Sequence, residues 1–86
     1  MRLVWRAQAL EQLEHLAARA PVQAAAVVQA AEWLADVGYS LGRSVAGDAG
    51  LYWPVPPQGF YYRVNRDRTE LVITAVKDAR RRRRPW

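Results

Sequence analysis

The segments Gly59-Phe60-Tyr61-Tyr62-Arg63-Val64 and Thr69-Glu70-Leu71-Val72-Ile73-Thr74-Ala75-Val76 decide the fold of this chain. In residues 60–65 more apolar and more polar side chains alternate, as expected for a strand. Residues 69–76 are rich in β-branched side chains and apolar at both parities, which predicts an inner strand covered on each side. The intervening Asn65-Arg66-Asp67-Arg68 consists of turn-forming residues. The two segments therefore predict a β-hairpin.

The residues before this hairpin predict one strand followed by two helices. Leu3-Val4-Trp5 is β-prone and centres a strand over residues 2–6. Apolar residues then recur at helical spacing and predict helices over residues 7–19 and 21–37. Pro21 suits the first turn of the second helix, and Gly38 suits its C-terminal cap. The connection is so short that the helices are expected to form an antiparallel hairpin.

Each helix has a predicted apolar stripe. In the first helix the stripe consists of Ala7, Leu10, Leu13, Leu16 or Ala17, and Ala20. In the second it consists of Ala24, Val27, Ala31 and Leu34. These stripes are the faces that we expect to pack on the sheet.

Residues 38–50 are rich in glycine and serine and predict a loop, and Leu51-Tyr52-Trp53 predicts a further strand. Because Pro54 lacks an N–H group, this strand is expected to be short, to lie at an edge, or to end there. The order of elements predicts an α+β fold. An N-terminal strand and an αα-hairpin precede a three-stranded antiparallel meander, with both helices on one face of the sheet. We expect one domain over residues 1–79 and a basic C-terminal tail over residues 80–86.

Composition excludes several kinds of site. The chain has 86 residues, no cysteine and one histidine, so a disulfide framework, a thiolate zinc site and a cysteine nucleophile are excluded. The carboxylates show no ligand spacing, and we expect neither a metal nor a cofactor. No apolar run is long enough for a signal peptide or a membrane span, and a cytoplasmic protein without a membrane partner is expected.

The basic character of the chain is concentrated at its C-terminal end. The net charge is +5. Removal of Arg80-Arg81-Arg82-Arg83-Arg84 would leave a protein whose positive and negative charges balance. A run of like charge can be a solvated tail. Its position directly after the last predicted strand, close in sequence to Arg63, favours a surface that binds a polyanion.

In sum, the chain resembles the RelE/ParE superfamily of toxins from bacterial type II toxin–antitoxin pairs. The resemblance spans almost the whole chain. It rests on Trp5 with Ala9-Leu10 and Leu13, on Leu41-Gly42-Arg43, on Tyr62-Arg63-Val64, and on Val72-Ile73-Thr74-Ala75-Val76 followed by Arg80-Arg81. The chain departs from the family in its second strand, which lacks the usual basic residues, and in its tail, which lacks the Tyr or His of many ribosome-dependent nucleases.

The resemblance implies a β-α-α-β-β-β fold, a cognate antitoxin as partner, and one of two activities. Members like RelE enter the ribosome and cut messenger RNA, whereas members like ParE bind DNA gyrase and poison it. Concentrated basicity favours the ribosome and RNA, and the missing tail Tyr or His favours gyrase. A third class is a relic without toxicity whose basic surface docks the antitoxin.

The nuclease hypothesis requires cations for the phosphate and a group that moves protons. The candidate catalytic residues are Arg63, Lys77, Arg80 and Arg81, with Lys77 as the proton-transfer group. The candidate nucleic-acid-binding residues are Tyr61, Arg82, Arg83, Arg84 and Trp86, with Tyr61 stacking on a base or acting as a weak acid.

Two of these assignments have a structural alternative. Arg63 can instead pair with Glu70 across the hairpin. Trp86 can dock back onto the domain rather than stack on a base. His15 lies in a predicted helix, far in sequence from the cations, and is expected to be a structural or surface residue rather than a general base.

Overall fold

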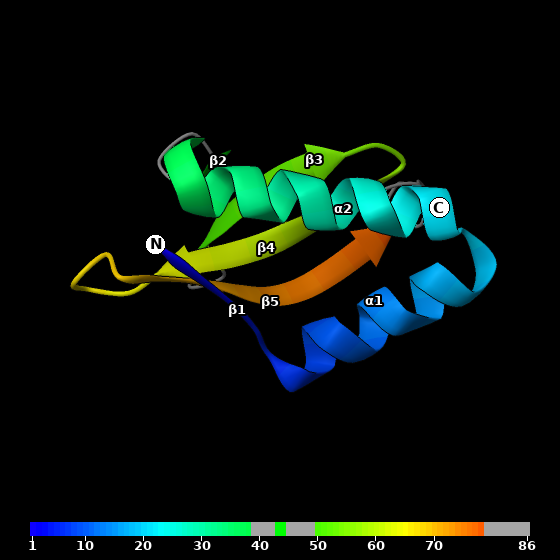
Figure 1. The fold of residues 1–86 in the computed structure, drawn as a ribbon, viewed down its shortest axis with the longest axis horizontal. Helices are drawn as coiled ribbons and strands as arrows, with labels where there is room; N and C mark the ends of the chain where they lie inside the picture. Colours follow the sequence, from blue (N-terminus) through cyan, green and yellow to red (C-terminus); the bar gives the residue numbers. More distant parts are fainter. Residues whose placement is uncertain (39–42, 45–49, 79–86) are drawn as a thin grey trace, which may run out of the picture.

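The computed structural model describes residues 1–38, 43–44 and 50–78, which form one helical layer on one sheet (Figure 1). The elements follow in the order β1 (Arg2–Trp5), α1 (Ala7–Arg19), α2 (Pro21–Trp33), the π-helical turn η1 (Leu34–Gly38), β2 (Arg43–Ser44), β3 (Leu51–Val55), β4 (Gln58–Val64) and β5 (Glu70–Asp78). The predicted α+β class is confirmed.

The sheet has the strand order β1-β5-β4-β3-β2. Strands β3, β4 and β5 form the predicted antiparallel meander, and β1 pairs in parallel with β5. The inner position predicted for β5 is therefore confirmed, although helices cover only one of its faces. The strands also run further than predicted. β3 continues through Pro54 to Val55, β4 begins at Gln58, and β5 ends at Asp78, so Lys77 lies within a strand.

The region predicted as a loop over residues 38–50 contains the short strand β2. Arg43 and Ser44 pair with Tyr52 and Leu51 of β3. An edge strand of two residues leaves little periodicity in the sequence, so propensity alone predicts a loop there. The pairing of β2 with β3 covers Leu51 and Tyr52 and does not reach Pro54. The missing N–H group of that proline is therefore tolerated within β3.

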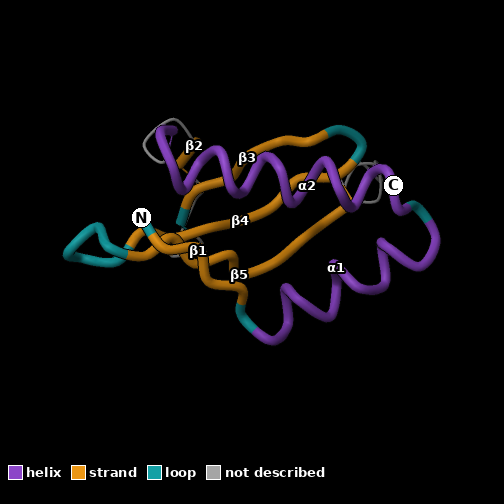
Figure 2. The backbone as a smooth tube through the Cα atoms, in the orientation of Figure 1, coloured by secondary structure: helices purple, strands orange, loops and turns teal. Residues whose placement is uncertain are grey.

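The second helix follows its predicted stripe. Ala24, Val27, Ala31 and Leu34 are all buried. The helix is α-helical to Trp33 and continues as the π-helical turn to Gly38, close to the predicted end. Residue 20 alone separates α1 from α2, and the two helices pack on the same face of the sheet (Figure 2).

The stripe predicted for α1 is partly wrong. Leu16 is buried and Leu13 is half-buried, but Leu10 is 43% exposed and the side chains of Ala7 and Ala17 are also exposed. The helix is turned so that Gln12 faces the sheet, where its Oε1 accepts a hydrogen bond from the Val76 N–H at 2.7 Å. A polar contact to a strand edge thus takes a place that periodicity assigns to an apolar side chain.

The core lies between the helices and alternate residues of β4 and β5. Phe60 and Tyr62 of β4, and Leu71 and Ile73 of β5, are fully buried. At the other end of the helical layer, the N-terminal amino group of Met1 donates to the Ala35 carbonyl at 2.9 Å. Burial of these large side chains supplies most of the favourable free energy of a small domain.

A β-bulge changes the alternation of β5 halfway along the strand. Tyr62 pairs with Ile73 while the preceding Tyr61 pairs with Ala75, so Thr74 is the extra residue. The Thr74 hydroxyl donates to the Tyr61 carbonyl at 3.3 Å. As a result, Ile73 before the bulge and Val76 after it both reach the core. This explains why the sequence of β5 is apolar at both parities.

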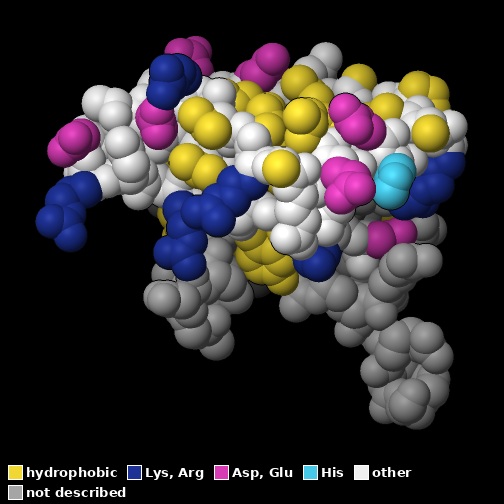
Figure 3. Space-filling view, turned by 90° about the horizontal axis from the view of Figure 1, so that it is seen from below, with side chains coloured by type: hydrophobic (Ala, Val, Ile, Leu, Met, Phe, Trp, Pro, Cys, Tyr) yellow, Lys and Arg dark blue, Asp and Glu magenta, His cyan; other side chains and the backbone are white. Residues whose placement is uncertain are grey.

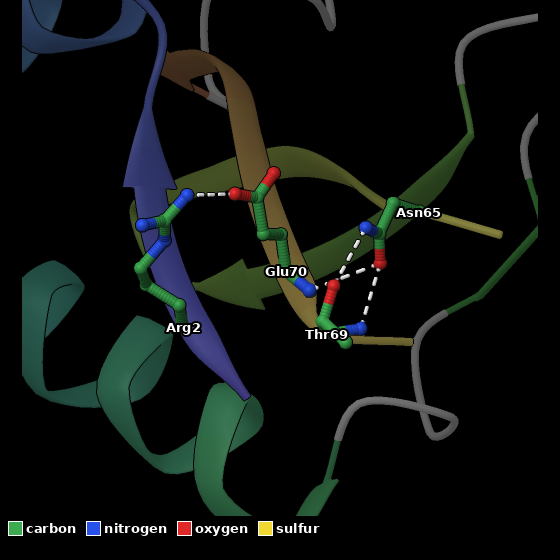
Figure 4. Close-up of polar contacts among 4 residues, drawn as sticks. All are labelled: Arg2, Asn65, Thr69 and Glu70. Atoms are coloured by element: carbon green, nitrogen blue, oxygen red, sulfur yellow. Dashed lines mark hydrogen bonds and ion pairs between the residues drawn. The ribbon is translucent and has the colours of Figure 1, made fainter. Parts of the chain in front are cut away.

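The turn between β4 and β5 is closed by Asn65, as its sequence predicts. The Asn65 Oδ1 accepts hydrogen bonds from the Thr69 N–H at 2.8 Å and the Glu70 N–H at 2.9 Å, and its Nδ2 donates to the Thr69 hydroxyl at 2.9 Å (Figure 4). Arg68 in this turn has a φ of 58°, in the left-handed region. The turn lies at the opposite end of the sheet from the α1–α2 connection (Figure 1).

Candidate functional site

The face of the sheet that the helices leave open carries the predicted site residues of the hairpin. On β4, the core side chains Phe60 and Tyr62 alternate with Tyr61 and Arg63, which therefore point to the open face. Lys77 pairs with Gly59, two residues before Tyr61, and belongs to the same face by register. The register thus places Tyr61, Arg63 and Lys77 on one face, and their predicted roles stay predictions.

Arg63 is exposed and stands opposite Val72. The alternative that Arg63 pairs with Glu70 is not what the structure has. Glu70 lies opposite Arg2 of the parallel strand β1, and the Arg2 guanidinium forms an ion pair with the Glu70 carboxylate (Figure 4). The sequence could not reveal this competitor, because Arg2 is 68 residues away from Glu70 along the chain.

The structure does not bring Arg63 and Lys77 together into one clamp. Lys77 stands opposite Gly59, and Arg63 lies four residues further along β4. At about 3.3 Å per residue, this separation is about 13 Å along the strand. The backbone positions of the two residues are thus well separated, and the roles predicted for Arg63 and Lys77 stay predictions.

Tyr61 and Tyr52 form an aromatic pair on the open face. Their ring centroids are 5.0 Å apart and the ring planes are tilted by 55°. The Tyr52 ring extends over Gly59, where a Cβ atom would collide with it. The ring of Tyr52 thereby reaches the register position of Lys77. The pairing of Tyr52 with Tyr61 places both side chains on the same face.

The other predicted site residues lie outside the described residues. They are the catalytic candidates Arg80 and Arg81 and the binding candidates Arg82, Arg83, Arg84 and Trp86. Their roles remain predictions. Over the described part of the chain, basic and acidic side chains are interspersed on the side seen in Figure 3, rather than gathered into separate areas.

A pocket lies between α1 and the last residues of β5, with a volume of about 420 Å³. It is lined by Gln12, His15, Leu16, Arg19, Gln58, Val76, Lys77 and Asp78. His15 thus shares a pocket with Lys77, although the two are far apart in sequence. The spacing of Gln12, His15 and Arg19, which places them on one side of α1, was the signal for this grouping.

Gln58 is the buried polar residue of this pocket. Its side chain is 4% exposed, and its Oε1 has no hydrogen-bond partner among the described residues. A buried acceptor without a donor is unfavourable by about 1–3 kcal/mol. Within the same residues, no three His, Asp or Glu side chains come together as metal ligands, and no helix is long and apolar enough to span a membrane.

The fold is shared with a solved structure. One chain of the crystal structure of the toxin–antitoxin complex RelBE2 from Mycobacterium tuberculosis matches this chain with a TM-score of 0.75. The match covers 90% of this chain and 95% of that chain, at 21% sequence identity. No family model and no curated protein matches the sequence. The likeness confirms the fold expected from the RelE/ParE resemblance.

Proposed function

We propose that this chain is the toxin of a type II toxin–antitoxin pair and that it cuts messenger RNA on the ribosome. The observation that carries the proposal is the likeness in fold to a chain of a toxin–antitoxin complex, at a TM-score of 0.75 over 90% of this chain. The sequence motifs shared with the RelE/ParE superfamily support it independently. A cognate antitoxin is the partner that this proposal requires, and it is acidic where it covers the arginine-rich surface.

The proposed reaction needs no metal. The 2′-oxygen of a ribose attacks the adjacent phosphorus, the bond from phosphorus to the 5′-oxygen breaks, and a 2′,3′-cyclic phosphate remains. A base takes the proton of the 2′-hydroxyl, cations stabilise the charge that builds up on phosphate, and an acid protonates the leaving oxygen. Arg63 is exposed and carries the planar fork that suits phosphate oxygens.

The spacing of the open face suits an extended strand of RNA rather than one phosphate. The backbone positions of Arg63 on β4 and Lys77 on β5 lie about 13 Å apart along the strands, and in this proposal the two side chains contact different phosphates of one RNA strand. Tyr61 and Tyr52 lie at the Lys77 end of the face, where their aromatic rings offer a base a stacking surface. In this arrangement Lys77 moves protons at its end of the face, and Arg80 and Arg81 remain candidates for the second cation at the reacting phosphate.

One observation favours the alternative, a ParE-type inhibitor that binds DNA gyrase. On the open face of the described strands, the carboxylate is that of Glu70, which Arg2 engages. The one histidine of the chain lies on α1 instead. The described strands therefore offer neither a free carboxylate nor an imidazole as general base on this face, and a toxin that acts by binding needs none.

Induced expression in bacteria separates the two activities. The nuclease predicts growth arrest with new 5′ ends in messenger RNA at ribosomal A-site positions, mapped by primer extension. The gyrase inhibitor predicts intact messages, an SOS response and inhibition of supercoiling by purified gyrase. Intact messages together with inhibited supercoiling overturn the proposed nuclease.

The variant Arg63→Ala tests the open face. Removing a donor that stabilises transition-state charge lowers cleavage by about 10²- to 10³-fold. The matched control is Arg66→Ala, which removes an exposed arginine from the β4–β5 turn and leaves cleavage within about twofold, since surface changes away from such sites are small. Equal cleavage by the two variants would show that Arg63 is not part of the site.

A further inference from the structure

We propose that Gly50 is a positioning residue for Arg63, because it makes room for the aliphatic stem of that arginine on the β3 side of the open face. Gly50 immediately precedes β3, and the next residue, Leu51, pairs with Tyr62 of β4. Since β3 and β4 are antiparallel, Gly50 lies across from Arg63. The effect of this placement on activity rests on the proposed function, whereas the placement itself does not.

The missing side chain of Gly50 is what gives Arg63 its place. A Cβ atom at Gly50 would lie 2.9 Å from the Arg63 Cγ and 2.6 Å from the Tyr62 carbonyl oxygen. Both distances are shorter than the van der Waals contact of about 3.5–4.0 Å. Gly50 also has a φ of 92°, a conformation that residues with a side chain rarely adopt. The backbone at this position and the stem of Arg63 therefore both require glycine.

The direction of Arg63 matters because a carboxylate lies on its other side. Strand β4 lies between β3 and β5, and on the β5 side Arg63 faces Val72, with Glu70 on the diagonal. A carboxylate can accept hydrogen bonds from more than one guanidinium, so the ion pair of Glu70 with Arg2 weakens this attraction without removing it. Contact with Gly50 holds the stem toward β3. The guanidinium thereby stays available to a phosphate.

The contact with Gly50 also indicates which strands the nucleic acid follows. The aromatic pair of Tyr52 and Tyr61 belongs to the same two strands, β3 and β4. Tyr61 lies two residues before Arg63, or about 7 Å along β4. An extended RNA strand that engages Arg63 in this orientation runs along β3 and β4, with a phosphate at the guanidinium and a neighbouring base on the tyrosine rings.

The placement is tested by nuclear Overhauser effects in the full chain, labelled with ¹³C and ¹⁵N. Contacts are expected between the Gly50 Hα atoms and the side-chain methylene groups of Arg63. In Gly50→Ala, the methylene groups of Arg63 are expected to contact those of Glu70 instead. If the wild-type chain shows Arg63 against Glu70 and not against Gly50, the inference is overturned, whatever the activity of the chain.

The consequence for function is tested by rescue. Gly50→Ala is expected to lower cleavage by about 10²-fold, the cost of a misplaced group. Adding Glu70→Gln is expected to bring cleavage back to within about tenfold of wild type, because the displaced guanidinium then has no carboxylate to pair with. A variant that has only lost stability is not restored in this way, since Glu70→Gln removes an ion pair and adds none.

Two further variants separate the position of Arg63 from folding. Gly50→Asn carries the same Cβ atom, and asparagine tolerates positive φ better than alanine. It is therefore expected to show the same loss and the same rescue at a higher melting temperature than Gly50→Ala. The matched control is Gly59→Ala, whose Cβ atom meets the Tyr52 ring rather than Arg63. Its loss of activity is expected not to be restored by Glu70→Gln.

Growth arrest after induced expression is measured beside cleavage, because it does not depend on which activity the toxin has. If the wild-type chain arrests growth without cutting messages, the nuclease fails, and Gly50 is judged by growth arrest. The inference is overturned if Gly50→Ala keeps the wild-type effect, if Glu70→Gln restores neither cleavage nor growth arrest, or if it restores Gly59→Ala equally well.

Discussion

The two faces of the sheet are built from alternate residues of the same strands, yet the described helices cover only one of them. On the closed face, Phe60 and Tyr62 lie under α1 and α2 at 0% exposure. On the open face, Tyr61 is half-buried by its pairing with Tyr52, and Arg63 is exposed. Consecutive residues of one strand therefore contribute to different properties of the protein. One set stabilises the fold and the other is available to a partner.

The difference teaches which side chains can change without loss of the fold. A buried aromatic side chain has contacts on every side, whereas an open-face side chain has contacts only across the strands. The open face can therefore vary with function while the closed face stays fixed by packing. This is the physical reason why one fold can serve an RNA cutter or a binding toxin.

The largest expected effect comes from Phe60, compared with its neighbour Tyr61. Phe60→Ala is expected to lower the free energy of unfolding by about 3–5 kcal/mol, because it leaves a cavity under the helices. Tyr61→Ala is expected to lower it by about 1 kcal/mol, the order of one cross-strand aromatic pair. Urea denaturation followed by circular dichroism measures both.

Stability of small domains is about 5–15 kcal/mol, so Phe60→Ala leaves little of it. Phe60→Leu is the conservative variant and is expected to restore most of the loss, because it keeps an apolar side chain of similar size in the cavity. If Tyr61→Ala costs as much as Phe60→Ala, then the open face is closed by something else in solution, and the comparison of the two faces fails.

The closed face was largely predictable from the sequence. The stripe of Ala24, Val27, Ala31 and Leu34 on α2 follows from helical periodicity alone. The error on α1 has a specific cause, the hydrogen bond from the Val76 N–H to Gln12. A side chain that caps a strand edge leaves no periodic signal, because its partner is 64 residues away along the chain.

The open face was less predictable. Sequence reasoning found Tyr61, Arg63 and Lys77, but their spacing depends on register. The register includes the bulge at Thr74 and the pairing of Lys77 with Gly59. Sequence reasoning also missed that Arg2 competes for Glu70, and that His15 shares a pocket with Lys77. Each of these is a long-range contact between strands or layers, which local patterns do not encode.

An intermediate effect is expected at Gly59, where the open face is packed most closely. A Cβ atom there would collide with the Tyr52 ring. Gly59→Ala is therefore expected to lower the free energy of unfolding by about 1–2 kcal/mol, since the ring must move away from Tyr61. In a Tyr52→Ala background, the same change is expected to be neutral or to stabilise by about 0.5–1 kcal/mol, because alanine costs less entropy in a strand than glycine.

Chemical denaturation of the four proteins of this cycle gives the coupling between Gly59 and Tyr52. Additive losses would mean that the Tyr52 ring does not rest on Gly59 in solution. In that case the aromatic pair with Tyr61 would not hold Tyr52 beside the register position of Lys77, and the Lys77 end of the open face would be less ordered than its Arg63 end.

The smallest expected effect is that of the ion pair between Arg2 and Glu70, at the rim of the open face. The Arg2 side chain is 72% exposed and that of Glu70 is 31% exposed, so solvent screens the pair. A double-mutant cycle with Arg2→Gln and Glu70→Gln is expected to give a coupling of about 0.2–1 kcal/mol, which falls as salt rises.

The consequence for Arg63 is larger than this energy suggests. In Arg2→Gln, Glu70 loses its partner and becomes free to form an ion pair with Arg63, which stands diagonally across the hairpin. If Arg2→Gln weakens RNA cleavage or partner binding while Arg2→Gln with Glu70→Gln restores it, then the contribution of Arg2 to the open face is to hold Glu70 away from Arg63. If the double variant is as weak as the single one, Arg2 contacts the partner itself.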